Sequence, residues 1–317
     1  MKRIVFLERN SFPPGVPIRR PGFEHEWVEF DETHPDGAAD RLRGAHVAVT
    51  NKCRINASVF RAVPTLELVA VSATGTDCVD KDAAQAAGVP VTNVTGYAAD
   101  SVAEHALALL LALARAVPAY DRAVAEGRWS KARQFCLFDY PILDLSGKRL
   151  GIVGAGIIGS AVARKAAAFG MEPVIAARKG AAPGPGQVAF EEMLASAHAI
   201  SIHCPLNDET RGLIGRAEFE AMRRQPFLVN TARGGIVDEA ALVEALERET
   251  IRGAAFDVAT AEPPPEGHPI PALAGRPNVI VTPHVAWASE AAMAALVEGL
   301  VSGLEAWARG EMRNRVA

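Results

Sequence analysis

The sequence predicts an α/β protein with two lobes, each built around a parallel β-sheet. Three observations carry this prediction. The chain of 317 residues is long for a single core. Short apolar runs alternate with helical patterns along its length. A glycine-rich turn near residue 154 then restarts that alternation in mid-chain. The apolar content of 49% fits a globular protein, and a formal net charge of −4 provides no broad basic surface for nucleic acid.

The first lobe is predicted from the segment before the turn. Its apolar runs predict strands at residues 4–7, 27–30, 45–49, 66–71 and 89–94, with helical patterns at 56–63 and 81–87. An alanine- and leucine-rich pattern predicts one long helix over residues 99–116, which Pro118 stops. Such a helix can join two lobes.

The second lobe is predicted from the segment after the turn. Strands are expected at residues 173–177, 199–203, 227–230, 253–258 and 279–282, with helices at 190–195, 216–222 and 239–248. Proline-rich residues 262–271 predict an extended loop. A last helix, about residues 289–309, is long enough to return to the first lobe. The first lobe is therefore expected to be discontinuous, with residues 1–98 plus 288–317 in one domain and 99–287 in the other.

The glycine turn lies in LGIVGAGIIGSAVARKA, which begins at Leu150. Gly154 permits a tight turn, Gly156 lets the backbone approach a pyrophosphate, and Gly159 lets helix and strand pack closely. Ile157 and Ile158 begin the helix, whose unpaired N–H groups suit an anion. A plain strand-to-helix turn is the alternative, but the flanking patterns favour a dinucleotide site in a Rossmann-like lobe.

The strand after the turn bears on the choice of dinucleotide. An NAD site usually has Asp or Glu about 20 residues beyond the glycines, to bind the ribose 2′-OH. Here Ala177 stands near that place, and Arg178 and Lys179 follow it. Because cations attract a 2′-phosphate, the sequence favours NADP(H) over NAD(H). Two solvated loop cations are the alternative.

Three ionisable side chains each follow a predicted strand of the second lobe. They are Arg233, Glu262 and His284. Each has an ordinary explanation alone: a surface cation, a solvated acid before proline, and a histidine packed near Trp287. Since ligands gather at the carboxyl ends of parallel strands, the three together predict a catalytic site.

The order of the motifs gives the chain a family resemblance over essentially its whole length. It resembles the D-isomer-specific 2-hydroxyacid dehydrogenases in LGIVGAGIIG, in HCPLNDET from His203, in NTARGG from Asn230, in DVATAEP from Asp257 and in TPHVAWAS from Thr282. The resemblance implies a flavodoxin-like substrate-binding (catalytic) lobe and a Rossmann lobe, with the active site in the cleft between them. It also implies reversible hydride transfer between NAD(P)H and a 2-keto acid.

The resemblance gives each of the three side chains a role. Arg233 binds and polarises the keto acid, Glu262 orients the histidine, and His284 is the acid/base. These residue types suit the chemistry. An imidazolium neutralises the charge that develops on a reduced carbonyl oxygen, a carboxylate favours the charged imidazole, and a guanidinium matches a carboxylate with paired donors.

The resemblance implies further contacts. The turn SATGTD is similar to the family loop whose N–H groups hold the substrate carboxylate, here Ala73, Thr74 and Gly75; a glycine-assisted turn is the alternative. Asp257 is implied to bind the nicotinamide carboxamide. The cofactor cleft is implied to include Cys204, Pro205, Thr231 and Ala232.

Longer strings suggest the substrate. NVTGYAADSVAEHALALLL, from Asn93, and residues 132–154 look most like the branch of glycerate dehydrogenases and glyoxylate/hydroxypyruvate reductases. Phosphoglycerate dehydrogenases tend to have a basic residue before the carboxylate loop, whereas this chain has Val71 and Ser72. A small unphosphorylated 2-keto acid is therefore expected. Another 2-keto acid, such as pyruvate or 2-ketogluconate, and a non-catalytic nucleotide-sensing corepressor-like protein are the open alternatives.

Other features predict the setting of the protein. The four cysteines, at 53, 78, 136 and 204, form no C-x-x-C pair or metal-ligand cluster, which is typical of reduced thiols in a cytoplasmic protein. No metal is expected. The apolar run at residues 4–7 is too short for a signal peptide, and no membrane association is expected. The apolar helix from Ala99 favours a homodimer.

Overall fold

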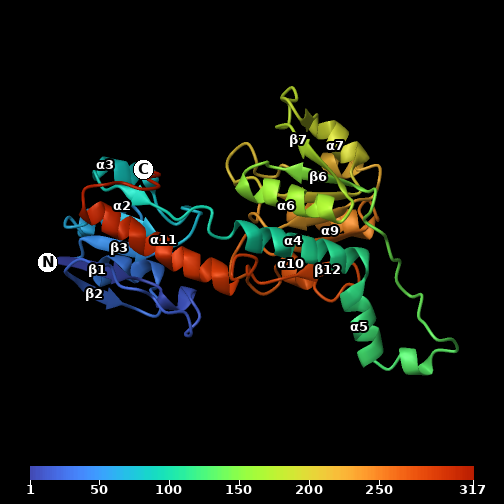
Figure 1. Ribbon diagram of the computed structural model, residues 1–317, viewed down its shortest axis with the longest axis horizontal. Coiled ribbons are helices and arrows are strands. Elements are labelled where there is room, and N and C mark those ends of the chain that lie inside the picture. Colours follow the sequence, from blue (N-terminus) through green and yellow to red (C-terminus); the bar gives the residue numbers. More distant parts are fainter. The chain divides into compact units, whose positions relative to one another are not determined.

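The computed structural model describes residues 1–317, apart from the side chain of Pro35. The chain divides into two compact units: Met1–Ala98 together with Ala288–Ala317, and Ala99–Trp287 (Figure 1). Each unit has its own sheet, of five strands in the first and seven in the second, and every strand pair is parallel. The predicted α/β class with two parallel sheets is confirmed.

The first unit has strand order β2-β1-β3-β4-β5. The strands are β1 (Lys2–Phe6), β2 (His25–Glu29), β3 (Val47–Thr50), β4 (Leu68–Val71) and β5 (Val91–Thr92). Every residue of β3 and β4 is buried, which is why these strands read as continuous apolar runs. The helices of this unit are α1 (Ala38–Arg41), α2 (Ala57–Ala62), α3 (Lys81–Ala86) and α11 (Glu290–Ala308), with short 3-10 turns η1 (Arg9–Ser11) and η2 (Pro35–Gly37).

Helix α11 brings the end of the chain back to the first unit. The Ser289 hydroxyl caps it by accepting from Ala292 N. Its apolar face packs against β4, and its large buried side chains are Leu296, Val297, Leu300, Val301 and Leu304. By length and composition alone α11 passes for a membrane span, as does the bent pair of helices over residues 99–125. Burial of one face is the pattern of a core helix.

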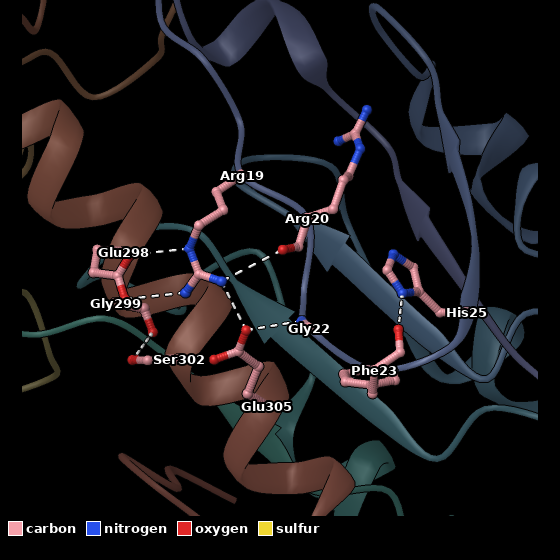
Figure 2. A network of polar contacts seen from close by, with 9 residues as sticks. All are labelled: Arg19, Arg20, Gly22, Phe23, His25, Glu298, Gly299, Ser302 and Glu305. Atoms are coloured by element: carbon pink, nitrogen blue, oxygen red, sulfur yellow. Dashed lines mark hydrogen bonds and ion pairs between the residues drawn. The ribbon is translucent and has the colours of Figure 1, made fainter.

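An ionic cluster ties the N-terminal part of the chain to α11 (Figure 2). The Arg19 guanidinium donates to both carboxylate oxygens of Glu298, at 3.0 and 3.1 Å, and to Glu305 Oε1 at 2.7 Å. Glu305 Oε1 also accepts from Gly22 N at 2.9 Å. The hydrogen bonds from Arg19 and Gly22 lower the pKa of Glu305. The segment around residues 19–22 is thus fixed on the helix surface.

The second unit has strand order β12-β11-β10-β9-β6-β7-β8. Its strands are β6 (Arg149–Val153), β7 (Glu172–Ala176), β8 (Gln187–Val188), β9 (Ala199–Ile202), β10 (Phe227–Asn230), β11 (Gly253–Phe256) and β12 (Val279–Val281). The chain starts at β6, proceeds to one edge, and then returns to β9 on the other side of β6. This is the doubly wound order, whose switch point between β6 and β9 is where such sheets bind ligands.

Helices cover this second sheet. They are α4 (Ala99–Ala114), α5 (Val117–Ala125), α6 (Ile157–Ala168), α7 (Phe190–Ser196), α8 (Arg216–Ala221), α9 (Glu239–Glu247) and α10 (Pro269–Ala272), with the 3-10 turn η3 (Trp129–Lys131). Helices α4 and α6 pack on each other and share one apolar cluster with β6 and β10. After α5, the chain around η3 extends away from the rest of this unit (Figure 1).

The prediction that Pro118 stops the long helix was wrong. The helix over residues 99–116 does not end because of Pro118. Helix α4 ends at Ala114, Ala116 adopts a left-handed φ of 51°, and Pro118 lies in the first turn of α5. Proline fits there because an N–H in the first turn of a helix has no partner within the helix, so its absence costs no hydrogen bond. The proline-rich stretch is irregular over residues 262–268, as predicted, and only its end differs, because Pro269 begins the short helix α10.

Candidate active site

The glycine turn connects β6 to α6 in the geometry that a phosphate site requires. Gly154 has a φ of 96°, and a Cβ there would lie 2.7 Å from Cys204 N. A Cβ on Gly159 would overlap the Gly154 carbonyl, whereas one on Gly156 would meet nothing within 4 Å. Gly156 is the N-cap of α6 and provides no side-chain cap. The first N–H groups of α6 are therefore available to an anion, and the turn has open space at Gly156.

The cations after β7 differ in their surroundings. Lys179 Nζ pairs with Glu218 Oε1 at 2.7 Å. Burial opposes the charge on Glu218, but hydrogen bonds from Lys179 and from Gly215 N outweigh it and lower the pKa of Glu218. Arg178 is exposed, and among the described residues its side chain has no hydrogen bond or ion pair. Of the two cations, Arg178 is therefore the one that can bind a phosphate without breaking an existing ion pair.

His203 and Cys204 follow β9 beside the glycine turn. His203 N donates to Val153 O at 2.7 Å, and its ring Nε2 is 2.8 Å from Ser201 Oγ. Burial lowers the pKa of His203 to about 4 and raises the pKa of the Cys204 thiol. At neutral pH the first is an uncharged imidazole and the second a thiol.

Asn230 shapes the loop that presents Arg233. Its side chain is fully buried at the end of β10, where Nδ2 donates to Arg233 O at 2.9 Å and Oδ1 accepts from Ala232 N at 3.0 Å. Arg233 Nη1 donates to Ala232 O at 2.7 Å. A Cβ on Gly234 would overlap Ala259 O, so this loop packs closely on the one that follows β11. Asn230 was not singled out from the sequence, although a polar residue ending an apolar strand was a usable signal.

His284 and Glu262 form the pair that the sequence predicted. His284 Nδ1 lies 2.7 Å from Glu262 Oε2. Glu262 Oε1 accepts from Ala259 N at 3.0 Å, which holds the carboxylate in place. A carboxylate can only accept, so the imidazole donates from Nδ1, and its Nε2 is the ring nitrogen left for another partner. His284 has a left-handed φ of 56°, a backbone conformation that residues other than glycine adopt uncommonly.

Asp257 holds the loop on which His284 lies. The carboxylate is 1% exposed. Oδ1 accepts from Thr282 Oγ1 at 2.6 Å and Val285 N at 3.0 Å, and Oδ2 accepts from Ala286 N at 2.9 Å. Buried charge is tolerated when both oxygens are hydrogen-bonded in this way. The expected bond from Asp257 to the cofactor stays a prediction, whereas its role in positioning the loop is visible in these contacts.

In the first unit, residues 73–75 directly follow β4. Ala73 O accepts from Val94 N at 3.1 Å, Thr74 O accepts from Asn93 Nδ2 at 2.7 Å, and Thr74 Oγ1 donates to Val94 O at 2.9 Å. Among the described residues, the backbone N–H groups of Ala73, Thr74 and Gly75 donate no hydrogen bond. The carbonyls of Ala73 and Thr74 and the Thr74 hydroxyl therefore fix the loop, and its backbone N–H groups are available to bind a carboxylate.

The second unit fits a dinucleotide. Thr231 Oγ1 is buried without a hydrogen-bond partner in the part of the chain that the structure describes, and Gly156 opens onto space at the N-terminus of α6. No group of three metal-ligating side chains occurs among the described residues. A doubly wound lobe of this kind, with an acid/base pair beside its sheet, is the arrangement of a nicotinamide-dependent oxidoreductase.

Comparisons with known proteins give the same class. The family described as D-isomer specific 2-hydroxyacid dehydrogenase, NAD binding domain, matches residues 107–286. A glycerate dehydrogenase of Methylorubrum extorquens is 45% identical over 316 residues, covering 99% of each chain. A hydroxypyruvate reductase of Blautia hydrogenotrophica is 33% identical, with 99% of each chain covered. An NADPH-dependent glyoxylate/hydroxypyruvate reductase of Sinorhizobium meliloti, solved with NADP and malonate, superposes with a TM-score of 0.85 at 31% identity, covering 100% of this chain and 97% of the other.

The chain belongs to the D-isomer specific 2-hydroxyacid dehydrogenase family. It is an oxidoreductase that uses a nicotinamide cofactor and acts on a small organic acid. The family and enzyme class predicted from the motifs are thereby confirmed.

Proposed function

We propose that this protein reduces a small 2-keto acid, hydroxypyruvate or glyoxylate, reversibly to the D-2-hydroxy acid with NADPH. The 2.7 Å hydrogen bond between His284 Nδ1 and Glu262 Oε2 carries the proposal, because it prepares an imidazole for proton transfer. The names of the glycerate dehydrogenase and hydroxypyruvate reductase relatives, similar over nearly the whole chain, support the substrate class.

The mechanism assigns a task to each side chain. When bound, the nicotinamide supplies the hydride that adds to the keto carbon. His284 donates the Nε2 proton to the carbonyl oxygen as negative charge develops there, and Glu262 stabilises the imidazolium and fixes its orientation. Arg233 binds the substrate carboxylate and polarises the carbonyl with its paired donors. In the oxidative direction His284 takes the hydroxyl proton instead.

The two units divide the work of binding. We assign substrate binding to residues 1–98 and 288–317, where the N–H groups of Ala73, Thr74 and Gly75 receive the substrate carboxylate. Residues 99–287 form the dinucleotide-binding domain. The residues that we assign to binding the dinucleotide are Gly154, Gly156, Ile157, Ile158, Gly159, Arg178, Lys179, Cys204, Pro205, Thr231, Ala232 and Asp257.

A substrate panel tests this function. The purified protein is assayed with hydroxypyruvate, glyoxylate, pyruvate and 2-ketogluconate, and oxidation of NADPH is followed by absorbance. We expect the highest kcat/KM with hydroxypyruvate or glyoxylate. Preference for pyruvate or 2-ketogluconate would show that the enzyme acts on a different 2-keto acid within the same family. If no keto acid is reduced, the enzymatic proposal fails and the corepressor-like alternative gains support.

The cofactor preference depends on Arg178. NADPH is expected to give a higher kcat/KM than NADH, since Ala177 replaces the usual acid and the exposed Arg178 can bind a 2′-phosphate. Arg178→Ala should raise the KM for NADPH about 10-fold, the equivalent of one charge-assisted hydrogen bond, and leave the KM for NADH unchanged. Lys179→Ala is the matched comparison and should have the smaller effect, because Lys179 already pairs with Glu218. More efficient use of NADH, with NADPH kinetics spared in Arg178→Ala, would refute the preference.

We also propose a cytoplasmic homodimer assembled through α4, α5 and the segment that follows. This part of the second unit has exposed apolar side chains, which are Val117, Val124, Trp129, Phe135, Phe138 and Ile142. Exposed apolar surface of this extent is typical of interfaces. All four cysteines are free, as suits a reducing compartment. Light scattering after size exclusion measures the solution mass, and the mass of one chain would contradict the dimer.

A further inference from the structure

We infer that His105 and Thr282 form a positioning relay that fixes the loop of His284 for proton transfer. His105 lies on α4, and its Nε2 is 3.1 Å from Thr282 Oγ1 and 3.6 Å from Asp257 Oδ1. Thr282 Oγ1 lies 2.6 Å from Asp257 Oδ1. The inference rests on the proposed function, because it assigns these side chains to the proton transfer that His284 performs.

The direction of each hydrogen bond in the relay follows from its acceptors. The Asp257 carboxylate can only accept, so the single hydroxyl proton of Thr282 is donated to Asp257 Oδ1. The hydroxyl oxygen can then only accept from His105, so His105 carries its proton on Nε2. The order is therefore His105 Nε2–H to Thr282 Oγ1–H to Asp257 Oδ1. A hydroxyl is needed at position 282, because no apolar side chain can both accept and donate.

The relay ends on the backbone that carries His284. Asp257 accepts from Val285 N and Ala286 N, the two residues after the catalytic imidazole. Ser101, one turn before His105 on α4, donates to Ala286 O at 2.7 Å. Helix α4 thus holds the same loop at two points. The loop needs this support because His284 keeps a left-handed φ of 56°, a conformation that persists only when its surroundings impose it.

The relay predicts a dependence on specific hydrogen bonds. Thr282→Val keeps the shape of the side chain but removes the hydroxyl, and Thr282→Ser keeps the hydroxyl. We expect Thr282→Val to lower kcat roughly 10- to 100-fold with a near-normal KM for NADPH, since small displacements of a catalytic group have effects of this size. Thr282→Ser should stay within about 2- to 3-fold of the wild type. At position 105, Gln can still donate near the Nε2 position whereas Leu cannot, so His105→Gln should retain more activity than His105→Leu.

A double-mutant cycle separates the relay from simple packing. If His105 acts through Thr282, His105→Leu should have little further effect on kcat in the Thr282→Val background. Glu104→Gln is the control on the same helix. Glu104 pairs with Lys165, so we expect this substitution to leave kcat unchanged. Thermal unfolding and NADPH binding, measured for every variant, show which proteins are folded.

A second measurement does not require turnover. The ring signals of His284 are followed by NMR, and Thr282→Val should change their chemical shifts while Thr282→Ser should not. A wild type that reduces no keto acid would refute the proposed function, and the NMR comparison would still decide the relay. Equal effects of Val and Ser at 282, equal effects of Leu and Gln at 105, or additive effects in the cycle would overturn the relay.

Discussion

His284→Ala should lower kcat for reduction of hydroxypyruvate or glyoxylate by roughly 10²- to 10⁴-fold, the range that general acid–base groups contribute. Without the imidazole, no side chain held by Glu262 can donate a proton to the developing oxyanion. The dissociation constant of NADPH should change little, because the glycine turn lies on a different loop of the same unit. Steady-state kinetics and a fluorescence titration with NADPH measure the two quantities.

Two further variants make this result interpretable. Position 284 has a φ of 56°, which asparagine tolerates better than alanine, so His284→Asn tests the loss of the acid with less backbone strain. His34 is 78% exposed in the first unit, and His34→Ala should leave kcat unchanged. A His284→Asn protein that keeps wild-type kcat would contradict the acid/base assignment. Loss of folding in both His284 variants would instead show that the residue is structural.

The sequence predicts the sheets well because parallel strands are buried on both faces. Strand β10 was predicted at residues 227–230, where it occurs, and all four of its residues are buried. The two-residue β8 was missed because, unlike the equally short β5, it lies outside any longer apolar run. The break before α5 was missed for a different reason. Pro118 is compatible with the end of one helix or the start of the next, and the left-handed Ala116 between them has no sequence signal.

In the candidate site, too, some residues could be predicted from the sequence and others could not. Glu262 and His284 could be found because a carboxylate and an imidazole follow strands of one sheet, and the structure places them 2.7 Å apart. His105 could not be found, since its partner Thr282 is 177 residues away and its own segment reads as an apolar helix. Asp257 was found but given one role, and its bonds to the loop of His284 depend on backbone positions that side-chain patterns do not encode.

Arg233→Ala should raise the KM for the keto acid and lower kcat, with a loss of kcat/KM of at least roughly 10²- to 10³-fold, which is the loss measured when one oxyanion donor is removed. Arg233→Lys should recover only part of this, because an ammonium keeps the charge but not the paired donors. The Asn230 bonds to the loop backbone do not involve the guanidinium, so the loop should persist in both variants. Initial rates over a range of keto-acid concentrations at saturating NADPH separate KM from kcat.

The division of the loss between the two constants identifies what Arg233 does. A contact made equally to substrate and transition state would change KM alone, whereas one that strengthens as charge develops on the oxygen lowers kcat as well. Arg248→Ala is the matched control, since Arg248 forms only a surface pair with Glu244 one turn away and such pairs contribute little. Kinetics of Arg233→Ala that match this control would contradict the assignment. A loss confined to KM would limit Arg233 to holding the carboxylate and leave polarisation of the carbonyl to His284.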